Sequence, residues 1–225
     1  MSSHAFTFCN EDFLALPSGA LFWPAQRLLC VSDLHFGKAS RYALHGASVL
    51  PPYEVYDTLL RLDQDIAEQR PKAVICLGDS FDRVGASDDL DPRAREWIIR
   101  LQAGVNWIWI EGNHDPGPLN LGGTHMHEVA IGPIVFRHIA LGETATGGEV
   151  SGHYHPKATV RAGNRAIIRR CFATDAHRVI LPAYGTYTGG LNVNASPMST
   201  LLATNAICIL TGAKALPIPR SKTRL

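Results

Sequence analysis

The chain has 225 residues, of which 46% are hydrophobic and 18% charged, and its formal net charge is +1. This composition is ordinary for a folded globular protein and argues against a disordered or fibrous one. No stretch approaches the roughly 20 apolar residues of a membrane-spanning helix, and the first residues lack the pattern of a signal peptide. We therefore expect a single cytoplasmic domain over residues 1–225, with residues 219–225 as a basic tail.

The distribution of charge indicates which partners the protein can bind, and the spacing of its cysteines indicates the redox state of its cellular compartment. Residues 1–150 contain 11 Lys or Arg and 19 Asp or Glu, whereas residues 151–225 contain 10 Lys or Arg and one acid. A basic final third can bind a polyanion, although a basic face that meets only solvent is the commoner case. The five cysteines are widely spaced without a Cys-x-x-Cys pair, which is typical of buried thiols in a reducing compartment.

The first half of the chain alternates apolar runs with amphipathic segments. Residues 6–32 predict a hairpin whose second strand covers 27–31. Residues 53–69 predict a helix, because apolar residues recur at helical spacing from Val55 to Ile66.

A strand, a helix and a strand come next. Residues 72–77 form an apolar run, and the helix after it has Asp91 as N-cap, Pro92 in its first turn and Gly104 at its end. Residues 106–111 then predict a second strand. This order implies a parallel crossover, so the pattern alone indicates an α/β fold with a parallel element.

The second half is rich in β signals and glycine. We expect strands at residues 124–131, 134–139, 149–153, 158–161, 166–172, 178–182 and 206–211, with His138 inside the second of them. The loop 182–190 contains three glycines and predicts a defined turn, but its residue types suggest no chemical role.

Polar side chains cluster where apolar runs end. They are Asp33, His35, Asp79, Asn113, His138, His153 and His155. In open α/β sheets the ligand site lies outside the carboxyl ends of the strands, so these loops should form the walls of one site. Asp33 and His35 are two residues apart, and in extended backbone such side chains point to the same side and can reach one ion.

This set of donors predicts a metal centre. Imidazole and carboxylate without thiolate suit Mn, Fe or Zn, and seven ligands are too many for one ion. Two ions about 3.5 to 4 Å apart could use them all if one carboxylate bridges, and Asp79 is the best bridge. A hydroxide between the ions would then be the nucleophile at phosphorus.

His114 is left over beside Asn113 and can face the substrate. Histidine exchanges a proton near neutral pH, so His114 can donate one to the leaving oxygen. Asp82 could hold His114 in the donating tautomer and favour its charged form. Lys38, Arg83 and Tyr154 adjoin site motifs and are candidate substrate contacts, with a purely structural role equally open for each.

Five motifs occur in order along the chain: DLH at 33–35, GDSFDR at 78–83, GNHD at 112–115, the isolated His138, and GHYH at 152–155. Together they resemble the calcineurin-like metallophosphoesterase superfamily. The resemblance implies two facing β-sheets flanked by helices. It also implies two ligand sets that share Asp79, one completed by Asp33, His35 and His155 and the other by Asn113, His138 and His153.

DLHFGK, GHYHP and LPAYGTYTGG at 181–190 extend the resemblance over nearly the whole chain, to the DNA ligase-associated metallophosphoesterases. That resemblance implies a DNA endonuclease or phosphodiesterase of DNA repair, with two divalent ions, manganese before iron or zinc, and functional association with a DNA ligase and a helicase. Two alternatives stay open. One is a phosphatase or phosphodiesterase on a small nucleotide-like substrate, and the other is a non-catalytic scaffold of the same fold.

Overall fold

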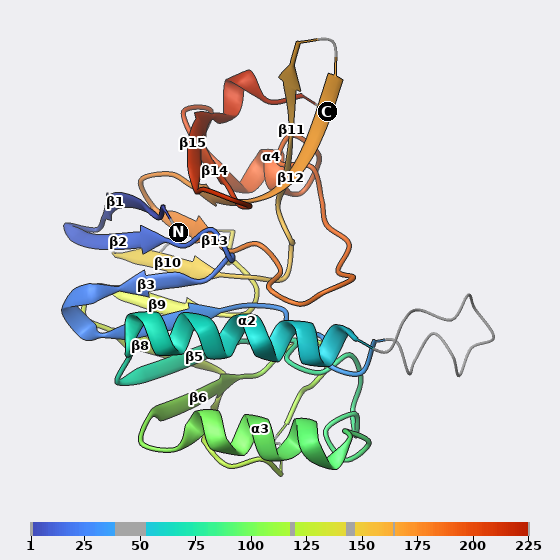
Figure 1. The fold of residues 1–225 in the computed structure, drawn as a ribbon. Helices are drawn as coiled ribbons and strands as arrows, with labels where there is room; N and C mark the ends of the chain where they lie inside the picture. The colour runs from blue at the N-terminus through green and yellow to red at the C-terminus, as the bar shows by residue number, and fades with distance from the viewer. Residues whose placement is uncertain (1, 39–52, 118–119, 143–146, 164, 225) are drawn as a thin grey trace.

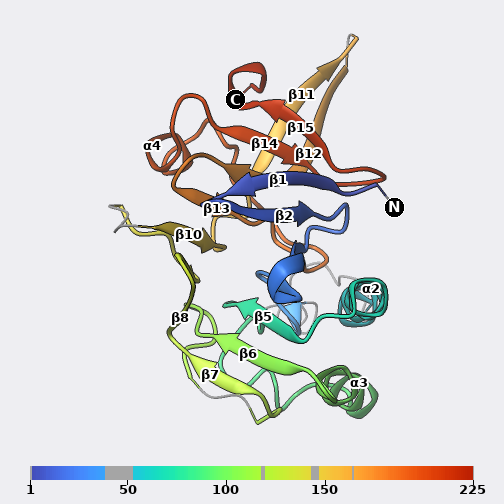
Figure 2. The same ribbon diagram turned by 90° about the vertical axis from the view of Figure 1, so that its left-hand side faces the viewer.

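The computed structural model describes residues 2–38, 53–117, 120–142, 147–163 and 165–224. Two mixed β-sheets face each other, and two long helices cover one of them (Figures 1 and 2). The expected sandwich of two facing sheets flanked by helices is therefore confirmed.

Sheet one follows the order β1-β2-β3-β4-β5-β6-β7. Its strands are β1 (His4–Phe8), β2 (Glu11–Ala15), β3 (Leu21–Trp23), β4 (Leu28–Val31), β5 (Ala73–Leu77), β6 (Asn106–Ile110) and β7 (Thr124–Met126). The first four strands pair antiparallel, and β4 to β7 pair parallel. The predicted parallel crossover is present, and β5 is almost wholly buried, as expected for a central parallel strand.

Sheet two follows the order β15-β14-β12-β13-β10-β9-β8, and β11 pairs with β12 outside this order. Its strands are β8 (Glu128–Ile131), β9 (Ile134–Arg137), β10 (Gly148–Ser151), β11 (Lys157–Ala162), β12 (Arg165–Thr174), β13 (Arg178–Ile180), β14 (Ile207–Leu210) and β15 (Leu216–Pro219). β10 is parallel to both β9 and β13.

Among the described residues the helices are α2 (Glu54–Gln69), α3 (Pro92–Gln102) and α4 (Met198–Leu201), with 3-10 turns η1 (Pro24–Gln26) and η2 (Arg220–Lys222). Leu59 and Leu62 of α2 are buried against sheet one. α3 begins where predicted, because the Asp91 carboxylate accepts the backbone N–H of Arg93 at 2.9 Å. In the described part of the chain, no helix combines the length and the apolar character needed to cross a membrane.

In the described part of the chain, three apolar clusters hold the layers together. One fills the space between sheet one and the helices α2 and α3, a second lies between the sheets, and a third lies on the outer face of sheet two beneath α4. In the cluster between the sheets, the ring of Trp23 from sheet one stacks on the ring of Phe136 from sheet two, with 6.4 Å between their centroids. The site lies where this middle layer ends.

Several boundaries differ from the sequence prediction. The segment 6–32 forms four strands instead of a hairpin, and the predicted strand 124–131 is split at His127 between β7 of sheet one and β8 of sheet two. β propensity marks extended backbone but does not tell which sheet a residue joins. His138 lies just beyond β9, not inside it.

The prediction of a basic tail at 219–225 is wrong for the residues that are described. Arg220 donates to the carbonyl oxygens of Leu202 and Ala203 at 3.0 and 3.3 Å, and Thr223 is buried. The backbone N–H of Arg224 donates to the carbonyl of Thr159 at 3.0 Å. A basic sequence frays only when its backbone lacks partners, and here it has them.

Candidate metal centre

All seven predicted ligands come together at the carboxyl ends of β4, β5, β6, β9 and β10. Among the described residues, two groups of side chains have ligand atoms within 4.8 Å of one another. The first group is Asp33, His35 and His155, and the second is Asp79, His138 and His153. The two groups belong to one contiguous site, because Asp79 lies close to members of both.

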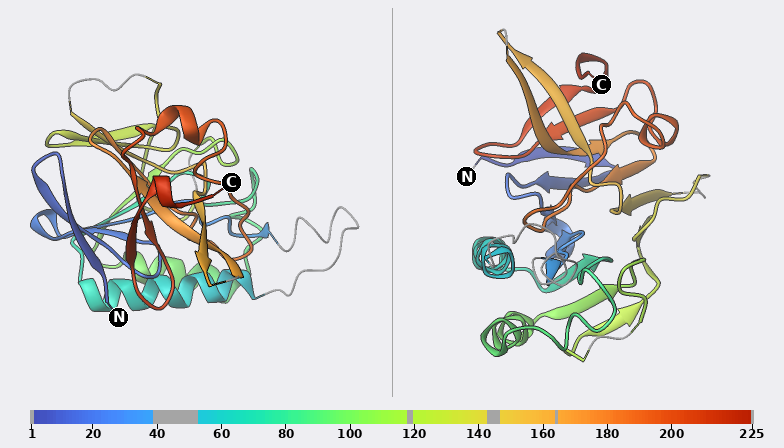
Figure 3. Two further views of the ribbon diagram at one scale, coloured as in Figure 1. Left: turned by 90° about the horizontal axis from the view of Figure 1, so that it is seen from above. Right: turned by 90° about the vertical axis from the view of Figure 1, so that its right-hand side faces the viewer.

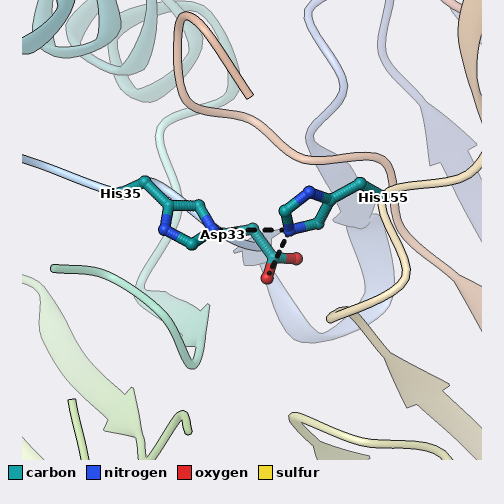
Figure 4. A group of neighbouring side chains, drawn as sticks. All are labelled: Asp33, His35 and His155. Atoms are coloured by element: carbon teal, nitrogen blue, oxygen red, sulfur yellow. Dashed lines mark hydrogen bonds and ion pairs between the residues drawn. The ribbon is translucent and has the colours of Figure 1, made fainter. Parts of the chain in front are cut away.

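The first group faces inward around a common point (Figure 4). His155 Nε2 lies 3.0 Å from Asp33 Oδ1 and 3.4 Å from His35 Nε2. His35 directs Nδ1 away from this point, toward the carboxylate of Asp82 at 3.1 Å. Donation of the Nδ1 proton to Asp82 leaves the Nε2 lone pair of His35 directed into the group.

The second group repeats this arrangement. His138 donates its Nδ1 proton to the carbonyl of Leu77 at 2.8 Å, and its Nε2 lies 3.0 Å from Asn113 Oδ1. His153 Nδ1 lies 3.3 Å from the same His138 Nε2, and Asp79 Oδ2 lies 3.4 Å from it.

Asp79 occupies the boundary between the groups. Its Oδ1 accepts the backbone N–H of His114 at 2.8 Å, while Oδ2 lies 3.4 Å from His138 Nε2 and 4.0 Å from His35 Nε2. One oxygen is therefore within reach of both donor sets, which is the position that a bridging carboxylate requires.

The spacing of the donor atoms fits divalent cations. Ligands about 2.1 Å from a tetrahedral ion lie about 3.4 Å from each other, and about 3.0 Å for neighbouring ligands of an octahedral ion. The donor pairs His155–Asp33, His155–His35 and His153–His138 lie at 3.0, 3.4 and 3.3 Å. Two imidazole lone pairs at such distances repel unless a cation or a proton lies between them.

Backbone strain accompanies the site. Asp33, His35, Asp79, His153 and His155 all have positive φ, between 46° and 69°. Such values are uncommon for residues other than glycine and persist only where surrounding structure enforces them. Asp33 and His35 therefore meet through two left-handed turns of the backbone, and the expectation of extended backbone between them is wrong.

Glycines allow the ligand loops to approach each other closely. A Cβ at Gly152 would lie 1.7 Å from Ser32 Oγ, and a Cβ at Gly112 would lie 2.1 Å from the backbone nitrogen of Asp79. The glycines of the GHYH and GNHD motifs are thus packing requirements of the site.

Burial and the neighbouring histidines shift the pKa values of the two carboxyl groups, Asp79 and Asp33, in opposite directions. Burial alone would raise the pKa of Asp79, but His138, the backbone N–H of His114 and His35 lower it to about 2. Burial also opposes ionisation of Asp33, and the adjacent His155 outweighs it, so the pKa of Asp33 lies below its usual value. Both carboxyls are therefore ionised at neutral pH and available as ligands.

The predicted role of Asp82 needs a correction. Its carboxylate contacts His35 Nδ1, whereas His114 Nδ1 donates at 3.1 Å to the backbone carbonyl of Asp82. The tautomer of His114 is therefore set by the backbone of residue 82, and the side chain orients a candidate ligand. The sequence alone could not show whether the carboxylate of Asp82 contacts His35 or His114.

Replacement of Asp82 by asparagine will test its contact with His35. The amide can still bond to Nδ1 but holds the imidazole less firmly, so we expect metal affinity to fall about 10- to 100-fold. Metal titration followed by calorimetry measures this change. Asp88 is exposed on the same loop, and Asp88→Asn is the matched control. Equal affinities for the two variants would contradict the contact's role.

His114 lies at the open side of the centre. Its Nε2 is 4.0 Å from Asp79 Oδ2, and its side chain is 34% exposed. Its ring packs edge-on against His35 with 5.4 Å between centroids. His114 can therefore meet a substrate without serving as a ligand.

The three candidate substrate contacts have different surroundings. Tyr154 is 9% exposed and belongs to the outer cluster of sheet two, which favours a structural role, and its contact with substrate stays a prediction. Arg83 forms an ion pair with Asp89 at the surface, and Lys38 is half-buried. Contacts of Arg83 and Lys38 with substrate stay predictions.

Asp115 has a structural role that the sequence did not reveal. Its buried carboxylate accepts the backbone N–H groups of Ser80, Phe81 and Gly112 at 2.8, 3.1 and 3.1 Å. Burial raises its pKa to about 6 in spite of two of these bonds. Asp115 thus joins the loop of Asp79 to the loop of Asn113. Its position as the last residue of the GNHD motif was the one sequence feature that could have identified this role.

The loop 182–190 supports the first ligand group. The backbone N–H groups of Tyr184 and Gly185 donate to the carbonyls of Ser32 and Asp33 at 2.8 and 3.1 Å. Tyr184 is fully buried and donates its hydroxyl to Asp65 of α2 at 2.8 Å. The loop therefore fixes the strained backbone that carries Asp33.

Gly185→Ala will disturb this support. A Cβ there would lie 2.0 Å from the carbonyl oxygen of Leu34, so the Asp33 loop must move. We expect a loss of about 1–3 kcal/mol in unfolding free energy and weaker metal binding. Gly189→Ala in the same loop is the control, because its Cβ meets nothing within 4 Å. Denaturant unfolding and metal titration compare the two, and equal behaviour would contradict the role of the loop.

Comparison with known proteins agrees with this geometry. The family model for calcineurin-like phosphoesterases matches residues 26–167. The crystal structure of Pseudomonas putida nuclease MPE is similar, with 27% sequence identity and a TM-score of 0.74, over 96% of this chain and 100% of that chain. A phosphoesterase from E. coli, YfcE, aligns with 14% identity and a TM-score of 0.37, over 73% and 83%. No curated protein sequence matches the chain significantly.

The family match covers well over half of the chain and includes all of the ordered motifs from DLH to GHYH. The structural match to the nuclease is consistent with the resemblance to the DNA ligase-associated metallophosphoesterases. With both ligand groups and the shared Asp79 inside the matched region, the chain belongs to the calcineurin-like phosphoesterase family.

Proposed function

We propose that the protein is an endonuclease that hydrolyses phosphodiester bonds of DNA with the help of two divalent cations. The observation that carries this proposal is the pair of ligand groups around Asp79, with His114 on their open side. The similar protein from Pseudomonas putida is a nuclease, which supports nucleic acid as the substrate of this chain.

The candidate ligands would bind the two cations in two sets that share Asp79. Asp33, His35, Asp79 and His155 would hold one cation, and Asp79, Asn113, His138 and His153 the other. Two such cations stabilise charge on the phosphate and make water a stronger nucleophile. The oxygen and nitrogen donors accept manganese, iron or zinc, and manganese is our first expectation.

His114 would protonate the leaving oxygen. Its Nδ1 proton is bonded to the carbonyl of Asp82 at 3.1 Å, so Nε2 is the nitrogen available to substrate. In the imidazolium form Nε2 carries the proton that passes to the departing alkoxide, while Nδ1 keeps its bond to the carbonyl. The backbone bond also keeps the ring directed at the centre.

Substrate profiling tests this function. The purified protein is loaded with manganese, iron or zinc and given circular single-stranded DNA, plasmid DNA, mononucleotides and bis-p-nitrophenyl phosphate. We expect linear products from circular DNA, because only internal cleavage opens a circle. Turnover of mononucleotides without cleavage of DNA would favour the alternative small substrate, and no turnover of any phosphoester would favour the scaffold.

The cellular setting stays part of the proposal. We propose action in DNA repair in the cytoplasm, in functional association with a DNA ligase and a helicase, by resemblance to the family named above. All five cysteines are unpaired, which agrees with a reducing compartment. Copurification of the ligase with the tagged protein after DNA damage would test this association.

A further inference from the structure

The hairpin of β11 and β12 projects from the body of the molecule (Figures 1 and 3). Arg165 to Arg170 of β12 pair with β11, whereas Cys171 to Thr174 pair with β14 inside sheet two. We call residues 157–170 the arm. Its base, Lys157, lies two residues after the candidate ligand His155.

The register divides the side chains of the arm between two faces. Phe172 belongs to the cluster between the sheets, and Cys171 belongs to the outer cluster. Because side chains alternate along a strand, even-numbered residues of β12 face inward like Phe172. Lys157 and Arg161 pair with Arg170 and Ala166, so both lie on the inner face.

Arg165 and Arg169 lie on the opposite, outer face by the same alternation, and both are exposed. Arg170 is on the inner face but is half-buried and donates to the carbonyl of Ala183 at 3.1 Å. Of the arginines in the arm, Arg161 is therefore the one that is both exposed and on the inner face.

The inner face is continuous with the metal centre. A Cβ at Gly190 would lie 2.2 Å from the carbonyl oxygen of His155 and 2.9 Å from Cε of Lys157, so Gly190 packs against both the candidate ligand His155 and the base of the arm. Partial burial, together with the charges of Arg170 and Lys38, lowers the pKa of Lys157. Lys38 follows the ligand loop of Asp33, so cations extend from the centre onto the arm.

The arm is strongly basic and its cations lack close carboxylate partners in the described part of the chain. Residues 157–170 include five Lys or Arg and no acid. In the described part of the chain, none of these five side chains forms an ion pair with a carboxylate within 4.0 Å. Ile168 stands between them on the inner face and is 61% exposed, which gives an apolar surface for sugars or bases.

A polyanionic strand fits this surface. Lys157 and Arg161 are four residues apart on β11, or about 13 Å at about 3.3 Å per residue. A nucleic-acid strand rises about 3.4 Å per nucleotide in a duplex, so the two cations span about four nucleotides. A mononucleotide is too short to contact both cations at this spacing, whereas a strand of several nucleotides can.

We infer that the inner face of the arm binds the phosphates of a nucleic-acid strand that continues from the metal centre, through Lys157 and Arg161. This inference rests on the proposed nuclease function. The arm thereby favours polymers over small phosphodiesters, while the metal centre performs the same hydrolysis on both.

The test compares two variants that each remove two charges from the arm. K157Q/R161Q changes the inner face, and R165Q/R169Q changes the outer face of the same hairpin. We expect the ratio of kcat/KM for DNA to that for bis-p-nitrophenyl phosphate to fall at least 10-fold in the inner variant and less than 3-fold in the outer one. The single variant R161Q changes an exposed residue and guards against misfolding of the double variant.

Binding of a phosphorothioate oligonucleotide gives a second readout that needs no cleavage. Loss of two phosphate contacts makes the slope of log K against log salt shallower by about 1.4 for a single strand. Equal slopes and equal ratios for the inner and outer variants would overturn the inference. If the unaltered protein hydrolyses the small diester but not DNA, the proposed function fails instead, and the two failures are distinguishable.

Discussion

Replacement of His114 by alanine will lower kcat on DNA by about 10²- to 10⁴-fold, the usual contribution of a general acid. The loss should be much smaller on bis-p-nitrophenyl phosphate, because its phenolate leaves without protonation. Metal content should not change, since His114 Nε2 lies 4.0 Å from Asp79 Oδ2 and the ring belongs to neither ligand group. Steady-state rates on both substrates, with metal analysis, measure the effect.

A matched control separates proton donation from the general loss of an imidazole. His177 is exposed and lies at a turn before β13, outside both ligand groups. His177→Ala should keep both activities. An equal fall on the two substrates in His114→Ala, or a loss of bound metal, would contradict the role of His114 as the acid.

Asp79→Asn will have the largest effect of any single change on metal content. The amide keeps an oxygen that can accept the backbone N–H of His114, so the loop should retain its conformation. It loses the charge that Oδ2 presents to both donor sets, and we expect both ions to be lost together. Activity should fall on the order of 10³-fold or more, because bound ions contribute several kcal/mol to the transition state.

The stoichiometry distinguishes a bridge from an ordinary ligand. Asp33 belongs to the first group alone, so Asp33→Asn should leave about one ion per chain while Asp79→Asn leaves none. Metal analysis after gel filtration gives both numbers. Retention of one ion by Asp79→Asn would show that the two groups bind independently, and the shared carboxylate would be disproved.

The fold was only partly readable from the sequence. The elements predicted correctly include the strand at residues 72–77, the start of a helix at Asp91, and the helix at residues 53–69. Each of them depends on local spacing of apolar residues or on a local cap. The split of 124–131 between two sheets and the docking of the C-terminal residues depend on pairing with distant strands. Local pattern does not contain that information, and so both were predicted wrongly.

The site divides in the same way. Residue types at the strand ends were enough to select all seven side chains that the structure brings together. Residue types could not predict the roles of Asp82, Asp115 and Tyr184, because each role depends on which atom of another part of the chain the side chain contacts.

The sequence by itself therefore selected the candidate ligands that the structure brings together and gave their order, since metal chemistry restricts which residue types can serve. The tertiary structure alone decided how those donors converge: through positive φ at five of them, close approaches at Gly112 and Gly152, and the support of loop 182–190. It also decided which cations of the basic final third lie on the inner face of the arm. Both are long-range effects, because the backbone conformations and the faces are set by contacts between residues far apart in the chain.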